Sequence, residues 1–286
     1  MSTDDPHRAP GPPGSTDAVT ETGVLETVRD GYDAVYDALP RSDTFNRIWR
    51  TNAYRGAFPA EFAHLSFLTL TEARRLLDVL ELTDGDVLVD IACGAGGPGL
   101  WAARQTGAAL IGIDPSATGL AAARHRAARV GLDDRSRFQS GTFERTGLPD
   151  RAADAVMSID AFQYAPDKRA ALAEFLRILR PGGRLGLVCF EVDARKVEGV
   201  PVLGVDPIAD YAPLLDAAGF TVEAYEETPG WADRVQAAFD AVIDAAAVLA
   251  TEMGERTAAG LLAEATLTVE LKPYRRRILA TAALRP

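Results

Sequence analysis

A glycine-rich turn between an apolar run and a helix-like segment constrains the fold most. Residues 87–91, Val-Leu-Val-Asp-Ile, predict a buried strand, and Ala-Cys-Gly-Ala-Gly-Gly-Pro-Gly follows at 92–99. The next segment, 100–105, has the composition of a helix. Glycines let the backbone approach a ligand closely, and a helix N-terminus presents free N–H groups to it. A strand, glycine turn and helix in this order are typical of sheets that bind a nucleotide-bearing cofactor.

The acidic residue near the end of this strand, Asp90, distinguishes between two such cofactors. Gly94, Gly96 and Gly99 satisfy the G-x-G-x-x-G pattern of dinucleotide sites. A carboxylate there would repel the pyrophosphate of NAD, whereas it would attract the ammonium and sulfonium groups of S-adenosylmethionine (SAM). We therefore expect the chain to bind SAM and not NAD.

A second carboxylate, Asp114, follows Asp90 by 24 positions, at the end of the next predicted strand. A carboxylate at that place can accept hydrogen bonds from both ribose hydroxyls of a nucleotide. An Asp after a strand is also a common N-cap of the following helix, a role that Ser116 could share. The spacing from the glycine turn favours the ribose interpretation.

Strand-like and helix-like segments alternate along the rest of the chain. This alternation predicts an α/β fold, a Rossmann-like seven-stranded and mostly parallel sheet with helices on both faces. The predicted strands are 87–91, 109–113, 137–139, 155–159, 184–190, 220–225 and 276–283. The predicted helices are 71–80, 116–130, 167–179, 207–218, one with an apolar face from 231 to 253, and a short one at 257–264.

The segments outside this alternation suggest further parts. Residues 1–22 are rich in Pro, Gly and small polar residues, which predicts a disordered arm. Residues 23–82 carry a helical apolar stripe and many aromatic residues, and we expect them to form a helical lid. Residues 228–272 are a helical insertion before the last strand, either a cap over a pocket or a contact between copies in a homodimer.

Composition excludes several classes of function. The 286 residues carry a net charge of −11, which disfavours nucleic acids and anionic membranes as partners. No apolar segment approaches the roughly 20 residues that span a bilayer, and no signal-peptide core is present. Two cysteines suit a reducing, cytoplasmic setting. No His/Asp cluster offers a cage for a divalent ion, so we expect no metal.

Five motifs in order resemble those of the class I SAM-dependent methyltransferases of the small-molecule type. They lie at 89–97 (Val-Asp-Ile-Ala-Cys-Gly-Ala-Gly-Gly), 112–116, 141–150, 153–167 and 179–183. The flanking lid and insertion are similar to those of bacterial sugar and natural-product O-methyltransferases. The resemblance implies that residues 83–286 form the methyltransferase domain.

The resemblance also implies cofactor contacts at the ends of the strands. The positions that match are Asp90, Ala92, Cys93, Gly94, Gly96, Asp114, Pro115, Gly141, Thr142, Phe143, Asp160 and Ala161. Asp90 would hold the amino group of SAM, and Thr142 and Phe143 would surround the adenine. Thr142 departs from the acidic residue that is usual in the family, and Ala92 replaces the commoner glycine.

The catalytic group is less well marked. Relatives often carry histidines where Gln163 and Tyr164 stand, and a tyrosine is a poor base at neutral pH. Candidate catalytic residues are therefore His64, Tyr164 and Glu191; His64 could instead seal the pocket, and Glu191 could be a solvated carboxylate. Methyl transfer does not require a base, because alignment with the activated sulfonium supplies much of the acceleration.

The expected activity is methyl transfer from SAM to a small-molecule acceptor, at an oxygen of a secondary metabolite. Alternatives are C- or N-methylation, a cyclase built on the methyltransferase fold, and a SAM-binding module without catalysis. A cyclase would form no S-adenosylhomocysteine (SAH), and a binding module would turn over no acceptor.

Overall fold

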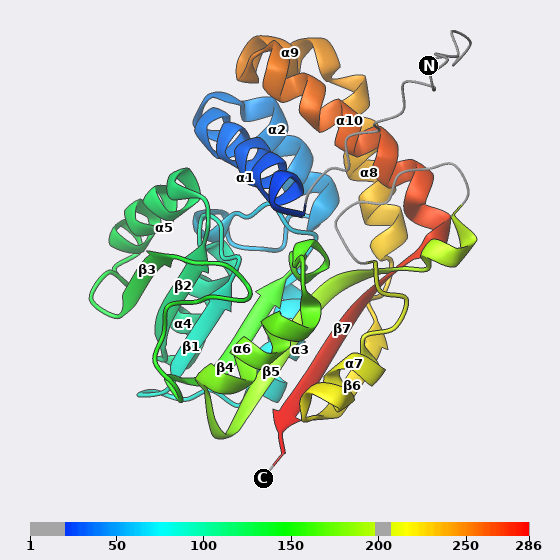
Figure 1. Ribbon diagram of the computed structural model, residues 1–286. Coiled ribbons are helices and arrows are strands. Elements are labelled where there is room, and N and C mark those ends of the chain that lie inside the picture. The colour runs from blue at the N-terminus through cyan, green and yellow to red at the C-terminus, as the bar shows by residue number, and fades with distance from the viewer. Residues whose placement is uncertain (1–20, 198–206, 286) are drawn as a thin grey trace, which may run out of the picture.

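The computed structural model describes residues 21–197 and 207–285, and its centre is one seven-stranded sheet (Figure 1). The strand order is β3-β2-β1-β4-β5-β7-β6, and β7 alone runs antiparallel to its neighbours. The strands are β1 Val87–Ile91, β2 Ala109–Asp114, β3 Ser136–Ser140, β4 Ala153–Ile159, β5 Leu179–Val192, β6 Phe220–Glu227 and β7 Arg275–Leu284. The predicted α/β class with a mostly parallel sheet is confirmed.

Helices cover both faces of the sheet, because its central strands are apolar on both sides. On one face, Leu76, Leu100 and Leu120 pack against Leu88 and Met157. These helices are α3 Leu70–Leu80, α4 Gly97–Thr106 and α5 Ala117–Arg129. The other face is covered by α6 Lys168–Ile178 and α7 Ala212–Ala218, whose apolar residues join a second core.

Side-chain caps set the starts of three of these helices. Ser116 Oγ accepts from the Gly119 N–H at 2.8 Å, and Asp167 Oδ1 accepts from the Ala170 N–H at 2.9 Å. Thr69 and Glu72 form a reciprocal capping box at the start of α3. Each cap satisfies backbone donors that have no partner within the helix.

The N-terminal and insertion helices lie together above the sheet (Figure 1). Helix α1 contacts both α5 and α10, so segments far apart in sequence form one helical layer. The N-terminal helices are α1 Glu21–Ala38 and α2 Asp43–Ile48, and the insertion forms α8 Trp231–Asp244, α9 Ala246–Met253 and α10 Glu255–Leu271. Short 3-10 segments span Leu39–Arg41, Ala60–Phe62, Phe162–Tyr164 (η4), Ala194–Lys196 and Lys272–Tyr274, and a π-helical turn spans Trp49–Ala53.

Several predicted boundaries were wrong. The apolar face over 231–253 is divided between two helices, because the chain leaves helical geometry at Ala245. The short helix predicted at 257–264 is the centre of the longer α10. The helix predicted from Pro207 begins at Ala212, since the Tyr211 N–H is bound by the Tyr225 hydroxyl instead. Residues 1–20 of the predicted arm lie outside the described residues.

Candidate active site

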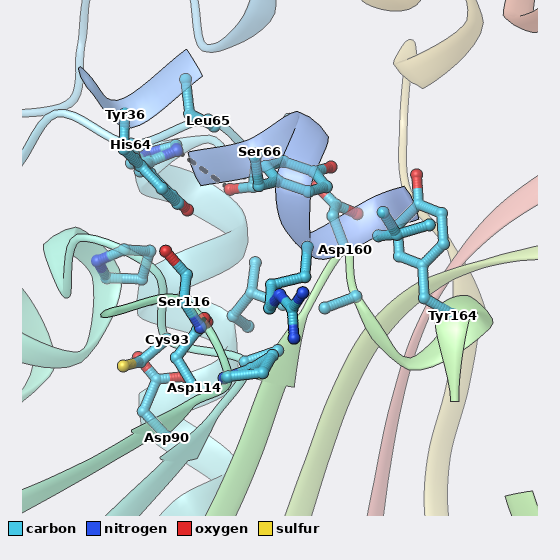
Figure 2. A pocket seen from close by; sticks show the side chains of 18 of the residues that line it. Tyr36, His64, Leu65, Ser66, Asp90, Cys93, Asp114, Ser116, Asp160 and Tyr164 are labelled. Atoms are coloured by element: carbon cyan, nitrogen blue, oxygen red, sulfur yellow. Dashed lines mark hydrogen bonds between the residues drawn. The ribbon is translucent and has the colours of Figure 1, made fainter. Parts of the chain in front are cut away.

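A pocket lies between α1, the loop before α3 and the carboxyl ends of β1, β2 and β4 (Figure 2). Figure 2 shows the Asp90 and Asp114 side chains close together and Tyr164 away from them. Predicted site residues that line the pocket are His64, Asp90, Ala92, Cys93, Asp114, Pro115, Phe143, Asp160, Ala161 and Tyr164. Predicted site residues that are not part of its lining are Gly94, Gly96, Gly141, Thr142 and Glu191.

Asp114 holds the glycine turn in place. Its Oδ2 accepts from the Gly94 N–H at 2.7 Å, and its Oδ1 accepts from the Ser116 N–H at 2.8 Å. Gly94 and Gly96 have φ of +51° and +72°, a region that favours glycine. A Cβ on Gly96 would lie 3.1 Å from the Ala123 Cβ, so Gly96 serves the packing of the turn on α5. The carboxylate therefore shapes the turn and also faces the pocket.

The buried carboxyl of Asp90 has an environment that suits a cation. It is 2% exposed, and burial, followed by the nearby Asp114 carboxylate, raises the pKa of Asp90 to about 8. A buried carboxyl is held neutral until an opposite charge compensates its ionised form. The two neighbouring carboxyls thus fit the ammonium and sulfonium groups of SAM, and Asp114 also fits its ribose hydroxyls.

Helix α1 covers the glycine turn. A Cβ on Gly94 would lie 1.9 Å from Tyr36 Oη, so the tyrosine rests directly on the backbone of the turn. One turn earlier, Asp33 accepts a hydrogen bond from the Ser116 hydroxyl. Tyr32 meets the ring of Tyr164 edge to face, with centroids 6.4 Å apart. Tyr32 and Tyr36 were predicted only as part of an apolar stripe, and their spacing of four is the signal that they share a face.

His64 forms part of the pocket wall and is held by its neighbours. Its ring centroid lies 4.5 Å from that of Tyr54 and 4.5 Å from that of Phe58. Its Nδ1 lies 2.9 Å from Ser66 Oγ, whereas its buried Nε2 has no hydrogen-bond partner among the described residues. Burial, and then the charge of Arg126, lower the pKa of His64 to about 3. The imidazole is therefore neutral at physiological pH.

Asp160 reaches the pocket but is committed to an ion pair. Arg277 donates to its two carboxylate oxygens from Nε at 2.7 Å and Nη2 at 2.9 Å. The Phe67 N–H donates to Asp160 Oδ2 at 2.7 Å. Nearby, burial and then the charge of Glu264 raise the pKa of Tyr164 to about 12. Tyr164 is thus a hydrogen-bond donor rather than a base near neutral pH.

Glu191, a candidate base from the sequence, lies outside the pocket. The Tyr225 hydroxyl donates to it, the Tyr211 N–H lies 3.3 Å from its Oε1, and Arg276 Nη1 lies 3.6 Å from its Oε2. These contacts hold the carboxylate between β5, β6 and β7, away from the pocket lining. Glu191 is therefore not placed to act as a base on an acceptor bound in this pocket.

Only one of the two residues predicted around adenine lines the pocket. The Thr142 N–H donates to the Arg145 carbonyl at 3.0 Å within a turn, and Phe143 faces the pocket. A Cβ on Gly141 would lie 2.7 Å from Ile113 Cγ2, so this glycine allows the turn to approach β2. Phe143 thus provides the apolar surface on which a purine could pack.

The described residues contain neither a metal-binding cluster nor a helix suited to cross a membrane. Within them, no group of three or more His, Cys, Asp or Glu side chains could hold a metal ion. None of the helices built from them is both long and apolar enough to cross a membrane.

Known proteins similar in sequence to this chain are methyltransferases. Residues 89–187 match the family model described as a methyltransferase domain. The 27-O-demethylrifamycin SV methyltransferase of Amycolatopsis mediterranei (strain S699) is 31% identical over 70% of this chain and 78% of its own length. A sterol 24-C-methyltransferase of Eremothecium gossypii is 28% identical over 59% of this chain, a match that spans 45% of that relative.

A solved structure extends the similarity in fold to nearly the whole chain. The cyclase SpnF superposes with a TM-score of 0.72 at 22% identity, over 90% of this chain and 94% of that one. The residues that line the pocket fit SAM, and the relatives that match in sequence are methyltransferases. The chain therefore belongs to the SAM-dependent methyltransferases, and its cofactor is SAM.

Proposed function

We propose that this enzyme methylates an oxygen of a small organic acceptor, a secondary metabolite. The observation that carries the proposal is the 31% identity, over 78% of its length, to the 27-O-demethylrifamycin SV methyltransferase, whose name refers to an O-demethylated acceptor. The aromatic lining contributed by Tyr32, Tyr36 and Tyr164 suits an acceptor with ring or apolar character.

The chain's own residues would contribute binding and orientation more than proton transfer. When bound, SAM supplies a methyl group that its sulfonium already activates. His64, with a pKa of about 3, is too weak a base to hold an acceptor proton at neutral pH. Tyr164, with a pKa of about 12, stays protonated and can donate to the acceptor oxygen. Alignment within a pocket closed by α1 is then the main source of acceleration.

The absence of a titrating base has a measurable consequence. At saturating SAM, we expect a pH–rate profile without a step near the ordinary histidine pKa of about 6.5. His64→Ala should weaken SAH binding, because His64 packs in the pocket wall, and it should leave the shape of the profile unchanged. A profile with a step near 6.5 that His64→Ala removes would instead assign general-base catalysis to His64.

The activity is tested by product analysis. The purified chain is incubated with SAM and a panel of hydroxyl-bearing macrocycles and aromatic polyketides, including 27-O-demethylrifamycin SV. We expect equal amounts of SAH and of a product heavier by one CH2, with the new methyl signal on oxygen by NMR. A methyl carbon bonded to carbon or nitrogen would overturn the proposal of O-methylation.

Ring closure is the second candidate function, and one observation favours it. The fold matches the cyclase SpnF over 90% of this chain, although 22% identity supports the fold alone. A cyclase would convert its substrate to a product of unchanged mass and form no SAH. The same incubation therefore separates the two functions.

The division of the chain is part of the proposal. We infer that residues 23–82 act as a lid on the methyltransferase domain at 83–286, with 228–272 as a cap. Support comes from Tyr36 on α1, which rests on the Gly94 backbone, and from the contact between α1 and α10.

A further inference from the structure

A second cavity, of about 400 Å³, adjoins the cofactor pocket. The two share the wall formed by Tyr36, His64, Leu65 and Cys93. On the far side of this wall the cavity is bounded by Ala95 of the glycine turn, by Phe45 of α2, and by Trp49 and Arg50 of the π-helical turn. A ligand in the cofactor pocket is therefore separated from this cavity by single side chains.

The charge of this cavity is opposite to that of the molecule. Arg50, Arg126 and Arg129 line it, and none of its described lining residues is acidic. The chain as a whole carries −11. Arg126 and Arg129 are three positions apart on α5, so their side chains leave the same face of the helix.

The positive charge is not neutralised within the described structure. Arg126 donates from Nη1 to the Ala95 carbonyl at 2.5 Å, and none of the three arginines forms an ion pair with a described carboxylate. Burial and the neighbouring Arg129 lower the pKa of Arg126 to about 10, as expected for a cation beside another cation. Such an arrangement favours an anion.

A second feature of the shared wall is a buried polar atom, Nε2 of His64, that has no partner among the described residues. The other ring nitrogen, Nδ1, lies 2.9 Å from Ser66 Oγ, which also accepts from the Leu68 N–H at 3.3 Å. When the Ser66 hydroxyl donates to Nδ1, the neutral imidazole carries its proton on Nε2, which is buried and has no described acceptor. An acceptor group at the wall would satisfy it.

We propose that this cavity is a carboxylate-binding subsite, in which Arg50, Arg126, Arg129 and the Nε2–H of His64 hold an acidic group beside the cofactor. The proposal rests on the proposed function, because the site is useful only next to bound SAM. The carboxylate belongs either to the amino-acid end of the cofactor or to an acidic acceptor. Phe45 and Trp49, which line the same cavity, suit the apolar body of such an acceptor.

The test compares charged and uncharged probes by calorimetric titration. SAH is compared with 5′-methylthioadenosine, which lacks the amino-acid end, and 2-naphthoate is compared with 2-naphthamide in the presence of saturating SAH. The test variant is the double change Arg50→Gln and Arg129→Gln, because both side chains are exposed and neither has a described ion pair. Arg74→Gln, on the exposed face of α3, is the matched control.

We expect the double variant to weaken the charged probe of one pair about 10-fold, the effect of losing two partly screened charge contacts, and to leave the uncharged probe unchanged. Loss for SAH assigns the subsite to the cofactor, and loss for naphthoate assigns it to the acceptor. Arg126→Gln should add to the same loss, with the melting temperature showing whether the glycine turn survives.

Equal affinities of the wild type and the double variant for both charged probes would overturn the proposal. So would a loss of the same size in Arg74→Gln. Failure of the proposed function would look different, since the wild type would then bind SAH and form no methylated product.

Discussion

Asp90 couples cofactor binding to a proton. With a pKa of about 8 in the empty pocket, this carboxyl is neutral at pH 6 and must ionise when a cation binds beside it. We therefore expect SAM affinity to rise as pH increases from 6 to 8, by up to about 10-fold per pH unit, with release of one proton. Calorimetric titration in two buffers of different ionisation enthalpy measures that proton.

The stability of the empty enzyme should change in the opposite direction. A carboxyl whose pKa is raised on folding contributes stability below its unfolded value of about 4, and this is lost as pH rises through 8. Asp90→Asn cannot ionise, so it should remove the proton release and weaken SAM binding. Binding of SAM that is independent of pH in the wild type would rule out this account.

Asp114 has two roles, one in holding the glycine turn and one predicted in binding the ribose, and its substitution by alanine removes both. Asp114→Ala removes the acceptor of the Gly94 and Ser116 N–H groups and a predicted acceptor for the ribose hydroxyls. Hydrogen bonds to a charged group contribute about 1.5–3 kcal/mol, so we expect SAH to bind roughly 10- to 100-fold more weakly. Asp134→Ala, at an exposed position after α5, is the control. Unchanged binding by a folded Asp114→Ala would refute the ribose role.

Helix α1 is the element on which closure of the pocket depends. Deletion of residues 1–20 keeps α1 intact, and we expect SAH binding to be unchanged. Deletion of residues 1–38 removes Tyr32 and Tyr36 from the pocket lining and the hydrogen bond between Asp33 and Ser116. It should weaken SAH binding about 10-fold or more, given the apolar area that the two tyrosines cover. Calorimetry and circular dichroism on both truncations test this, and equal binding by the two would show that α1 is not a lid.

At the scale of helices and strands, the sequence predicts those elements that local residue patterns determine. The strand at 87–91 and the helix cap at Ser116 agree with the structure, because an apolar run bounded by a glycine turn and a capping hydroxyl are local signals. The break at Ala245 could not be predicted, since alanine favours helices and no local signal marks the break. It lies where α8 and α9 both pack against α2 and α10, which are contacts between separate segments of the chain.

Only part of the candidate site could likewise be predicted from the sequence. The carboxylates at the ends of β1 and β2 follow from the parallel topology, and both line the pocket. Asp160 was expected to contact the cofactor, but Arg277, 117 positions later, binds both of its oxygens. Such a contact depends on β7 entering the sheet beside β5, and nothing local to either residue signals it.

At the scale of the whole molecule, a buried ion network joins the parts around the site. Arg277 is fully buried and contacts Asp160 after β4 and Glu72 on α3. Glu72 also accepts from Arg234 of α8 at 2.6 Å. The sheet, a covering helix and the insertion therefore meet at two carboxylates and two guanidinium groups. The network supports the pocket wall from behind, since Asp160 and the segment before α3 both face the pocket.

Removing one member of this network should lower the free energy of unfolding by several kcal/mol, about 3–5 by analogy with other buried pairs. Arg277→Met leaves Asp160 and Glu72 buried with less compensation, and loss of one partner of a buried pair costs about 3–5 kcal/mol. Arg75→Met is the matched control, because the side chains of Arg75 and its partner Glu226 are 48% and 50% exposed and an exposed pair contributes about 0–1 kcal/mol. Urea unfolding of both variants measures the difference, and equal free energies of unfolding would show that the network does not stabilise the fold. If the network also positions the site, Arg277→Met should weaken SAH binding under conditions where the variant remains folded, whereas Arg75→Met should not.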